Sequence, residues 1–229
     1  MVFDVDGTLV DSMTHFGEIA SEVIHLHYGK TKLWGGQAYR DTSGLPFPFQ
    51  LEKLFPGDSR NVVAAKEFQT SKESSYHEAP FYSDMEETLV ALKKRGYWIA
   101  TSSNNEQDLV LKKFARRTSL FDLILGFRPN FSKGADHFQT IAKLFGVTPS
   151  DMLFVGDSLH DAKMAHENNI SFVGKLGTFQ RSDFVAQGFT SVAIEHLSEL
   201  TKILIHDSTS QHSQTDRDFG RGHRHSVGR

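Results

Sequence analysis

The stretch Phe3-Asp4-Val5-Asp6-Gly7-Thr8 (residues 3–8) sets two aspartates behind a short apolar run and in front of a glycine. Residues 1–5 are apolar apart from Asp4, with side chains typical of a strand, and Gly7-Thr8 indicates a tight turn. Side chains two positions apart on a strand point to the same side, so Asp4 and Asp6 can face one crevice. An Asp-x-Asp pair before glycine is by itself more often a hydrogen-bonded turn than a site, so its meaning depends on the rest of the chain.

The segment that follows this turn is predicted to be mainly helical. Residues 13–28 carry apolar side chains at helical spacing, and Gly29 stands where that helix should end. Residues 30–58 are rich in glycine and proline, so any helices there are expected to be short, such as one around residues 50–55. Residues 59–78 again show helical spacing, which Pro80 ends.

From residue 81 onward the chain alternates between predicted helices and strands. The expected helices span 83–95 (with Ser83 and Glu86 as a capping box), 108–117, 135–145 and 161–167. The expected strands are short apolar runs at 97–101, 123–126, 152–156, 171–174 and 192–194. This alternation favours a parallel sheet covered by helices. We therefore predict an α/β fold, a three-layer, Rossmann-like parallel sheet flanked by helices.

The first strand is far in sequence from the other strands, which predicts a discontinuous domain. A length of 229 residues exceeds the roughly 150 of a typical domain and leaves room for a second, smaller unit. We expect a core of residues 1–11 and 82–205, with residues 12–81 inserted as a helical cap. Residues 206–229 contain almost no apolar side chains and are predicted to be a disordered polar tail.

Composition excludes several classes of protein. The net charge of -3 argues against a nucleic-acid binder that works through a global basic field. The absence of cysteine excludes thiolate nucleophiles, cysteine-ligated zinc and disulfides, and is compatible with a cytoplasmic location. No apolar run approaches the ~20 residues of a membrane span, and the acidic start differs from a signal peptide. We expect neither a nucleic-acid nor a membrane partner, and the oligomeric state stays open.

Polar residues stand where each predicted strand ends, which is where open parallel sheets bind ligands. Asp157 follows the strand at 152–156 and would join Asp4 and Asp6 at the same edge. Carboxylates that share a small volume raise one another's pKa unless a cation is present, and a hard ion such as Mg²⁺ suits this sparse oxygen set. Lys133 and the donors of Thr101 and Ser102 could hold anionic oxygens. Together these groups favour phosphoryl transfer.

The combination of Asp-Val-Asp-Gly-Thr-Leu (4–9), Thr101-Ser102, Lys133 and Gly-Asp-Ser-Leu-His-Asp (156–161) resembles the haloacid dehalogenase superfamily of phosphohydrolases. The inserted segment is similar in position and helical character to the small helical cap of that superfamily. Only three residues precede Asp4, fewer than the family usually has, so a short first strand is expected.

The resemblance implies a role for each motif residue. Asp4 would be the nucleophile that forms an aspartyl-phosphate, and Asp6 would act as general acid and then as general base. The implied magnesium ligands are Asp4, the backbone carbonyl of Asp6, and Asp157. The implied phosphate-binding groups are Thr101, the Ser102 amide and Lys133, with Asp161 orienting Lys133 or a metal-bound water.

Within that family, an aspartate at position 6 implies a phosphate ester as substrate and not a haloacid. A small phosphorylated metabolite of the sugar phosphate or phosphoglycolate type is expected. The alternatives are a sugar phosphomutase similar to the β-phosphoglucomutases, a phosphonatase that uses a cap lysine, and a non-catalytic binding module. Arg40 and Gly44, in a loop-like stretch of the cap, are candidates for substrate specificity, although Arg40 could equally pair with Asp41.

Overall fold

The computed structural model describes residues 1–189 and 192–204, so the predicted tail lies outside the described residues. Its centre is a five-stranded sheet in the order β2-β1-β3-β4-β5, and every neighbouring pair is parallel. The strands are β1 (Val2–Phe3), β2 (Ala100–Thr101), β3 (Leu153–Gly156), β4 (Ser171–Lys175) and β5 (Ala193–Ile194). The parallel sheet predicted from the alternating pattern is confirmed.

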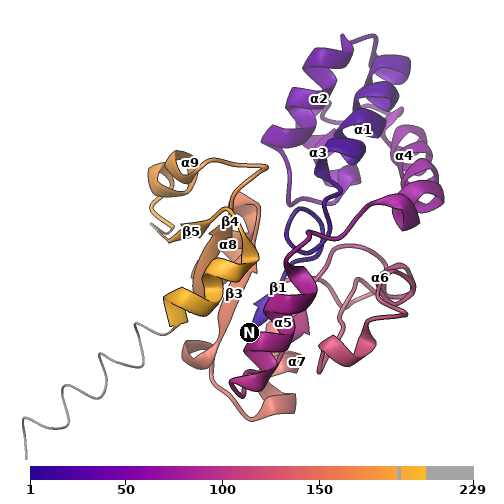
Figure 1. Ribbon diagram of the computed structural model, residues 1–229. Helices are drawn as coiled ribbons and strands as arrows, with labels where there is room; N and C mark the ends of the chain where they lie inside the picture. Colours follow the sequence, from indigo (N-terminus) through magenta and orange to yellow (C-terminus); the bar gives the residue numbers. More distant parts are fainter. Residues whose placement is uncertain (190–191, 205–229) are drawn as a thin grey trace, which may run out of the picture.

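Apolar residues that alternate along the strands bury both faces of the sheet. Phe3 and Val155 belong to one buried cluster, with residues of α5 (Met85–Lys94) and α6 (Gln107–Lys113). Val2 and Phe154 belong to the other, with residues of α7 (Ala135–Phe145), α8 (Leu159–Glu167) and α9 (Arg181–Ala186). Successive side chains on a strand point to opposite faces of the sheet. Each cluster therefore lies between one face of the sheet and one layer of helices. The three-layer fold is thereby confirmed (Figure 1).

The short first strand is paired on both sides. Phe3 is in register with Thr101 of β2 and with Val155 of β3. Asp4 continues this pairing, because its N–H donates to the Val155 carbonyl at 2.9 Å. The strands are parallel, so the residues that follow β1, β2 and β3 emerge at one edge of the sheet.

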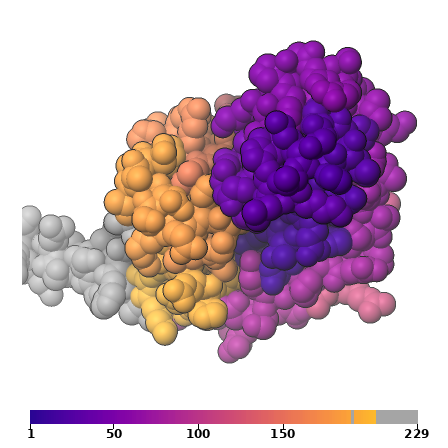
Figure 2. All heavy atoms as spheres, turned by 90° about the horizontal axis from the view of Figure 1, so that it is seen from above, coloured from indigo at the N-terminus to yellow at the C-terminus, as the bar shows by residue number. Residues whose placement is uncertain are grey.

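Four helices lie between β1 and α5 in sequence and group together at one end of the sheet (Figure 1). They are α1 (Met13–Tyr28), α2 (Lys32–Asp41), α3 (Phe47–Leu54) and α4 (Asn61–Ser75). Figure 2 shows this helical unit, in indigo and violet, as a rounded body over the rest of the chain. Aromatic side chains pack inside it, among them Phe47 stacked on Phe68 with ring centroids 4.0 Å apart. The residue limits of the core and the cap stay a prediction.

The helix α2 is longer than the glycine-rich sequence suggested. It spans ten residues and runs through Gly35 and Gly36, where only short helices were expected. A Cβ on Gly35 would lie 3.1 Å from the Ser21 Cα, so the glycine permits α2 to pack closely on α1. Thr31 caps the helix, because its side chain accepts a hydrogen bond from the Trp34 N–H. Glycine here serves helix packing and does not end the helix.

The strand predicted at 123–126 does not form, although Leu123 makes an isolated bridge with Ala100. The Leu125 N–H, which a ladder with β2 would use, donates instead to the Thr101 hydroxyl at 2.9 Å. The Gln107 side chain binds the groups that face away from β2, donating to the Ile124 carbonyl at 3.0 Å and accepting from the Gly126 N–H at 2.8 Å. A long-range side-chain contact of this kind leaves no periodic signal in the sequence.

One prediction about the flanking helices was wrong, and one helix was not predicted. The residue before α5 is Asp84, and no side chain caps that helix, so the predicted capping box is not formed. The Asp84 carboxylate instead accepts from the Ser198 N–H at 2.9 Å. The short helix α9 was not anticipated. No helix in residues 1–189 and 192–204 combines the length and apolarity needed to cross a membrane.

Candidate active site

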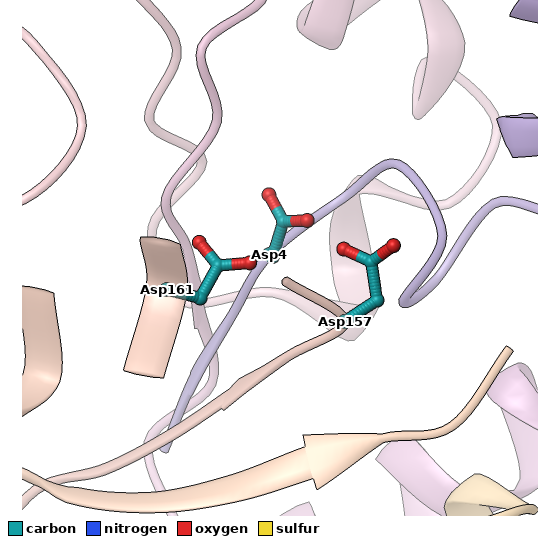
Figure 3. A group of neighbouring side chains, drawn as sticks. All are labelled: Asp4, Asp157 and Asp161. Atoms are coloured by element: carbon teal, nitrogen blue, oxygen red, sulfur yellow. The ribbon is translucent and has the colours of Figure 1, made fainter. Parts of the chain in front are cut away.

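Three buried aspartates converge at the carboxyl edge of the sheet. Asp4 follows β1, Asp157 follows β3, and Asp161 lies in the first turn of α8. One carboxylate oxygen from each lies within 4.8 Å of the others. Figure 3 shows Asp4 between the other two. Strands far apart in sequence therefore bring three negative charges into one small volume.

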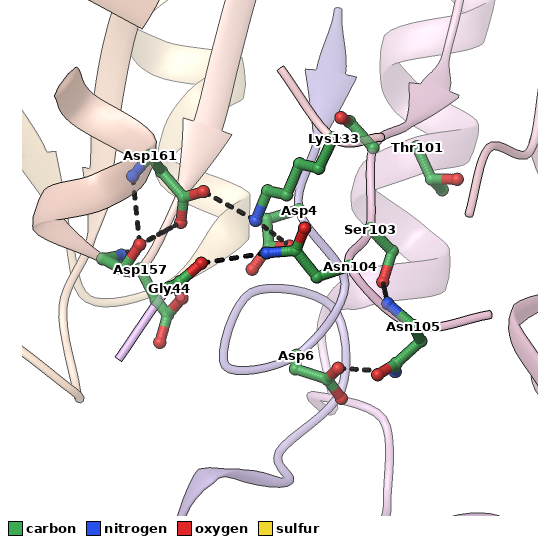
Figure 4. Close-up of polar contacts among 12 residues, drawn as sticks. Asp4, Asp6, Gly44, Thr101, Ser103, Asn104, Asn105, Lys133, Asp157 and Asp161 are labelled. Atoms are coloured by element: carbon green, nitrogen blue, oxygen red, sulfur yellow. Dashed lines mark hydrogen bonds and ion pairs between the residues drawn. The ribbon is translucent and has the colours of Figure 1, made fainter. Parts of the chain in front are cut away.

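Lys133 joins two of these carboxylates. Its Nζ lies 2.6 Å from Asp4 Oδ1 and 2.6 Å from Asp161 Oδ1 (Figure 4). The lysine stands in the turn before α7, and only 3% of its side chain is exposed. A buried ammonium between two carboxylates is strongly held, because its removal would leave both carboxylates buried without a counter-charge.

The shifted pKa values of these groups show that the cluster contains more acidic than basic side chains. Burial raises the pKa of Asp4 to about 7, the Lys133 ammonium opposes this rise, and the Asp161 carboxylate adds to it. Burial and the Asp4 carboxylate also raise the pKa of Asp157 well above its usual range. Burial works against the charged form of Lys133, but Asp161 and Asp4 overcome it and raise the pKa of the lysine. One lysine does not balance three buried carboxylates.

A divalent cation fits this donor set. The three side chains offer only oxygen ligands, which magnesium prefers. Asp161 is already committed, because its Oδ2 accepts from the Ser158 hydroxyl at 2.6 Å while its Oδ1 pairs with Lys133. In the part of the chain that the structure describes, no hydrogen bond uses the Asp6 carbonyl oxygen. The set that the family resemblance implies as magnesium ligands, Asp4, Asp157 and this carbonyl, stays a prediction.

Gly7 lets the loop after β1 pass close to Asp157. Its φ is +75°, a conformation that favours glycine, and a Cβ there would lie 2.1 Å from Asp157 Oδ2. The glycine in the Asp-x-Asp-Gly motif is therefore required by geometry.

The Asp6 side chain is held in a fixed orientation on the wall of the site. Its Oδ1 accepts from the Ser12 hydroxyl at 2.8 Å, and its Oδ2 accepts from the Asn105 side-chain amide at 2.7 Å. Ser12 is the residue before α1, but its hydroxyl does not cap that helix. Ser12 thus contacts the candidate acid–base residue and does not serve as a helix cap.

The structure does not bring the Thr101 hydroxyl or the Ser102 amide to the carboxylates. The Thr101 hydroxyl accepts from the Leu125 N–H at 2.9 Å. The Ser102 N–H donates to the Phe3 carbonyl at 2.8 Å, as part of the β1–β2 pairing. These two groups are thus engaged in backbone contacts, in contrast to the role that the family resemblance implied.

The Ser102 hydroxyl has a buried partner in α7. It lies 2.9 Å from Nδ1 of His137. Burial, together with the nearby Lys133 charge, lowers the pKa of His137 to about 4, so the ring is neutral at pH 7. A neutral histidine can sit beside Lys133 without adding a second positive charge.

Asn104 and Asn105, just after β2, face the site, although no role was predicted for them. The Asn104 side chain donates to the Gly44 carbonyl at 2.9 Å and so links the sheet edge to the helical unit (Figure 4). No partner for the Asn104 backbone N–H is found among the described residues. Thr178 was also missed; its hydroxyl donates to Asp157 Oδ2. These residues carry no motif beyond their place after a strand.

The carboxylates open into a cavity of about 120 Å³ between the sheet edge and the helical unit. Gly44 lines this cavity, whereas Arg40 does not: it is exposed and donates to Gln37 at 2.7 Å. Lys72 of α4 lines the cavity and was not singled out in the sequence. Burial lowers the pKa of Lys72, and the carboxylates of Asp6 and Asp4, which act to raise it, offset this only in part.

Comparisons with known proteins agree with this geometry. A family model described as haloacid dehalogenase-like hydrolase matches residues 1–175. A Dickeya dadantii protein named "Probable phosphatase IndB" is 28% identical over 218 residues, which cover 87% of this chain and 90% of that protein. A phosphoglycolate phosphatase of Pseudomonas fluorescens is 26% identical over 233 residues, which cover 93% of this chain and 85% of that protein.

A solved structure gives the same result for the fold. A haloacid dehalogenase-like family hydrolase from Streptococcus pneumoniae aligns with a TM-score of 0.73 at 18% identity, covering 89% of this chain and 96% of that chain. At this identity the likeness bears on the fold alone. The family match spans most of the chain and includes the strand-end aspartates and Lys133. The resemblance seen in the four motifs is therefore confirmed, and the chain belongs to the haloacid dehalogenase-like hydrolase family.

Proposed function

We propose that this hydrolase is a magnesium-dependent phosphatase that cleaves phosphate monoesters of small metabolites, of the phosphoglycolate or sugar phosphate type. The observation that carries the proposal is the buried set of Asp4, Asp157 and Asp161 around Lys133, open to a small cavity. The relatives named phosphatase and phosphoglycolate phosphatase support the same reaction.

Asp4 is the proposed nucleophile. One of its oxygens is held by Lys133, which favours the ionised carboxylate and leaves the other oxygen to attack phosphorus. The new bond joins that oxygen to phosphorus while the bond from phosphorus to the ester oxygen breaks. The product of this step is an aspartyl-phosphate and an alkoxide that needs a proton.

Asp6 is the proposed general acid and base. It lines the same cavity as Asp4, and Ser12 and Asn105 fix the orientation of its carboxylate. In the first step Asp6 gives its proton to the leaving oxygen. In the second it takes a proton from a water molecule that attacks phosphorus, which frees Asp4 and releases phosphate.

Asp4, Asp157 and the Asp6 carbonyl would hold the magnesium ion, with Asp161 acting through Lys133. The ion would offset the charge of the carboxylates and of the phosphate oxygens when bound. Lys133 and the backbone N–H of Asn104 are the proposed donors to the phosphoryl oxygens. Both are positioned by the protein before substrate arrives, which is the main source of catalysis in phosphoryl transfer.

The test is phosphate release by the purified protein with magnesium, using a panel of phosphorylated metabolites that includes 2-phosphoglycolate and glucose 6-phosphate. We expect turnover of at least one ester, and a loss on the order of 10⁴-fold in Asp4→Asn, which cannot form the covalent intermediate. Circular dichroism on both proteins would verify that the variant is folded. Equal rates for the two proteins, or no release from any ester, would exclude the proposal.

A further inference from the structure

The cavity contains a lysine whose ammonium has no salt-bridge partner among the described residues. Lys72 lies near the end of α4, and its Nζ donates to Oδ1 of Asn105, a neutral amide. The same ammonium lies 4.6 Å from the centre of the Phe16 ring. Among residues 1–189 and 192–204, no carboxylate oxygen lies within 4.0 Å of it, in contrast to Lys133, which has two such partners.

The surroundings of Lys72 increase the need for a counter-charge. Four aromatic residues line the same cavity, and they are Phe16, Tyr39, Phe47 and Phe68. A charge beside apolar walls is poorly solvated, and its attraction to an opposite charge is stronger there than in open water. The arrangement therefore favours an anionic group of a ligand next to Lys72.

Two further polar side chains of the cavity are already engaged. The Gln50 amide donates to the Leu45 carbonyl at 2.8 Å, and its oxygen accepts from Thr42 at 2.8 Å. The Gln69 amide donates to Glu73 at 2.7 Å. Few groups remain to bind the several hydroxyls of a sugar, whereas Lys72 can bind a single anion.

The size of the cavity restricts that anion further. Its volume of about 120 Å³ is well below the roughly 300–1,000 Å³ of a drug-sized site. The space must hold a phosphoryl group beside Asp4 and a short leaving group that reaches Lys72. A carboxylate on a chain of one or two carbons meets both requirements.

We propose that Lys72 is a specificity-determining residue that pairs with a carboxylate on the leaving group. The hydrolase then selects phosphate esters of short hydroxy acids over esters of neutral alcohols. This inference rests on the proposed phosphatase function. It assigns a task to a residue of α4, a helix that contributes none of the proposed nucleophile, acid–base or metal-binding groups.

A competing role for Lys72 is also visible. Asn105 contacts both Lys72 and Asp6, so the lysine could act by positioning Asp6 through the amide. The two roles differ in their consequences. A positioning residue affects every substrate alike and lowers kcat, whereas a residue that binds the leaving group affects only substrates that carry the anion.

The experiment compares two esters of nearly equal size, 2-phosphoglycolate and 2-hydroxyethyl phosphate, which differ in a carboxylate. We expect the wild-type protein to prefer 2-phosphoglycolate in kcat/KM by about 10- to 100-fold, the range of one charge-assisted hydrogen bond. Lys72→Met should remove this preference, mainly through KM, and leave hydrolysis of 2-hydroxyethyl phosphate within about threefold of wild type. Lys72→Arg should restore part of the preference.

Lys66→Met is the matched control, because Lys66 lies on the same helix, is exposed and does not line the cavity. It should leave both rates unchanged. An equal fall in both rates in Lys72→Met would overturn the proposal in favour of positioning, and so would a wild-type protein that hydrolyses both esters equally well. If the wild-type protein cleaves no phosphate ester at all, the proposed function itself fails. Should Lys72→Met not fold, Lys72→Gln provides the same comparison.

Discussion

The two walls of the cavity are built in different ways. On the sheet side, the strand-end site (Asp4, Lys133, Asp157 and Asp161) is a set of charges that contact one another within 2.6 to 4.8 Å. On the opposite side, the cap wall (Phe16, Tyr39, Phe47, Phe68 and Lys72) is aromatic and carries one unpaired charge. In the strand-end site Lys133 contacts two of the carboxylates. In the cap wall the Lys72 ammonium contacts a neutral amide.

This difference predicts that changes in the strand-end site alter both stability and activity, whereas changes in the cap wall alter selectivity. Lys133→Met should have the largest effect, because it leaves Asp4 and Asp161 buried without their cation. Breaking a buried ion pair from one side costs about 3–5 kcal/mol of unfolding free energy. Urea unfolding with and without magnesium would measure this loss, and phosphate release should fall with it.

Lys163→Met provides the control for that experiment. Lys163 lies 3.7 Å from Glu167 on the surface of α8, and its side chain is 57% exposed. An exposed pair of this kind contributes about 0–1 kcal/mol. If Lys133→Met were no more destabilising than Lys163→Met, the strand-end site would not be the tightly coupled cluster described above.

The sequence could predict the strand-end site but not the cap wall. Asp4 and Asp157 directly follow predicted strands of one parallel sheet, and parallel strands bring their carboxyl ends together. Lys133 lies in the turn before α7, after the predicted strand at 123–126 that does not form. Lys72 reaches the cavity only because α4 packs against α1 and α3 in the helical unit, and no local pattern encodes that packing. Other lysines of the cap, such as Lys66, look similar in the sequence.

The groups after β2 were predicted only in part, for a reason of register. Phe3 pairs with Thr101, which directs the Thr101 hydroxyl to Leu125 and the Ser102 N–H to Phe3. A shift of one residue would exchange these directions. Sequence identifies the end of such a strand, but the residue that faces the ligand depends on the pairing.

Metal removal should have the second largest effect. The folded-state pKa of Asp4 is raised to about 7 from 3.8. As pH rises from about 4 to about 7, the unfolded chain releases this proton before the folded chain does, so the metal-free protein should lose stability across that window. The raised pKa of Asp157 acts in the same direction.

Thermal unfolding in EDTA at pH 5 and pH 7.5 would measure this loss. Magnesium at about 100 times its dissociation constant should add about 2.7 kcal/mol, with a larger gain in melting temperature at pH 7.5 than at pH 5. Asp4→Asn has no such proton to release, so its metal-free stability should depend less on pH. Equal pH dependence in the two proteins would argue against a raised pKa of Asp4 in the metal-free folded protein.

A smaller effect is expected at the contact between the helical unit and the start of α8. Gly44 has a φ of +93°, and a Cβ there would lie 2.4 Å from the Ser158 hydroxyl and 2.6 Å from the His160 Cβ. Gly44→Ala should therefore hold the helical unit away from α8 and lower kcat/KM by about tenfold, since a misplacement of about 1 Å can cost up to about 100-fold.

Gly57→Ala is the control that distinguishes the effect of backbone strain from the effect of the steric contact at Gly44. Gly57 also has a positive φ, +68°, but no atom lies within 4 Å of its Cβ position. Both substitutions strain the backbone, by about 1–3 kcal/mol, and both should lower the melting temperature. Only Gly44→Ala should impair phosphate release; similar kinetics in the two variants would mean that closure of the helical unit does not depend on this contact.

The smallest effect is expected for the substitution of Arg40. It tests whether the cap wall extends beyond the residues that line the cavity. The sequence made this cation a candidate for substrate specificity or for a pair with Asp41, whereas the structure places it on the surface of α2, in contact with Gln37 and outside the cavity. An exposed charge at this distance from the site is screened by salt. Arg40→Ala should therefore change kcat/KM for 2-phosphoglycolate by less than about twofold and stability by less than about 0.5 kcal/mol. Steady-state kinetics at low and at physiological ionic strength would test this. A loss as large as that of Lys72→Met would show that the anion-binding side of the cavity extends to α2.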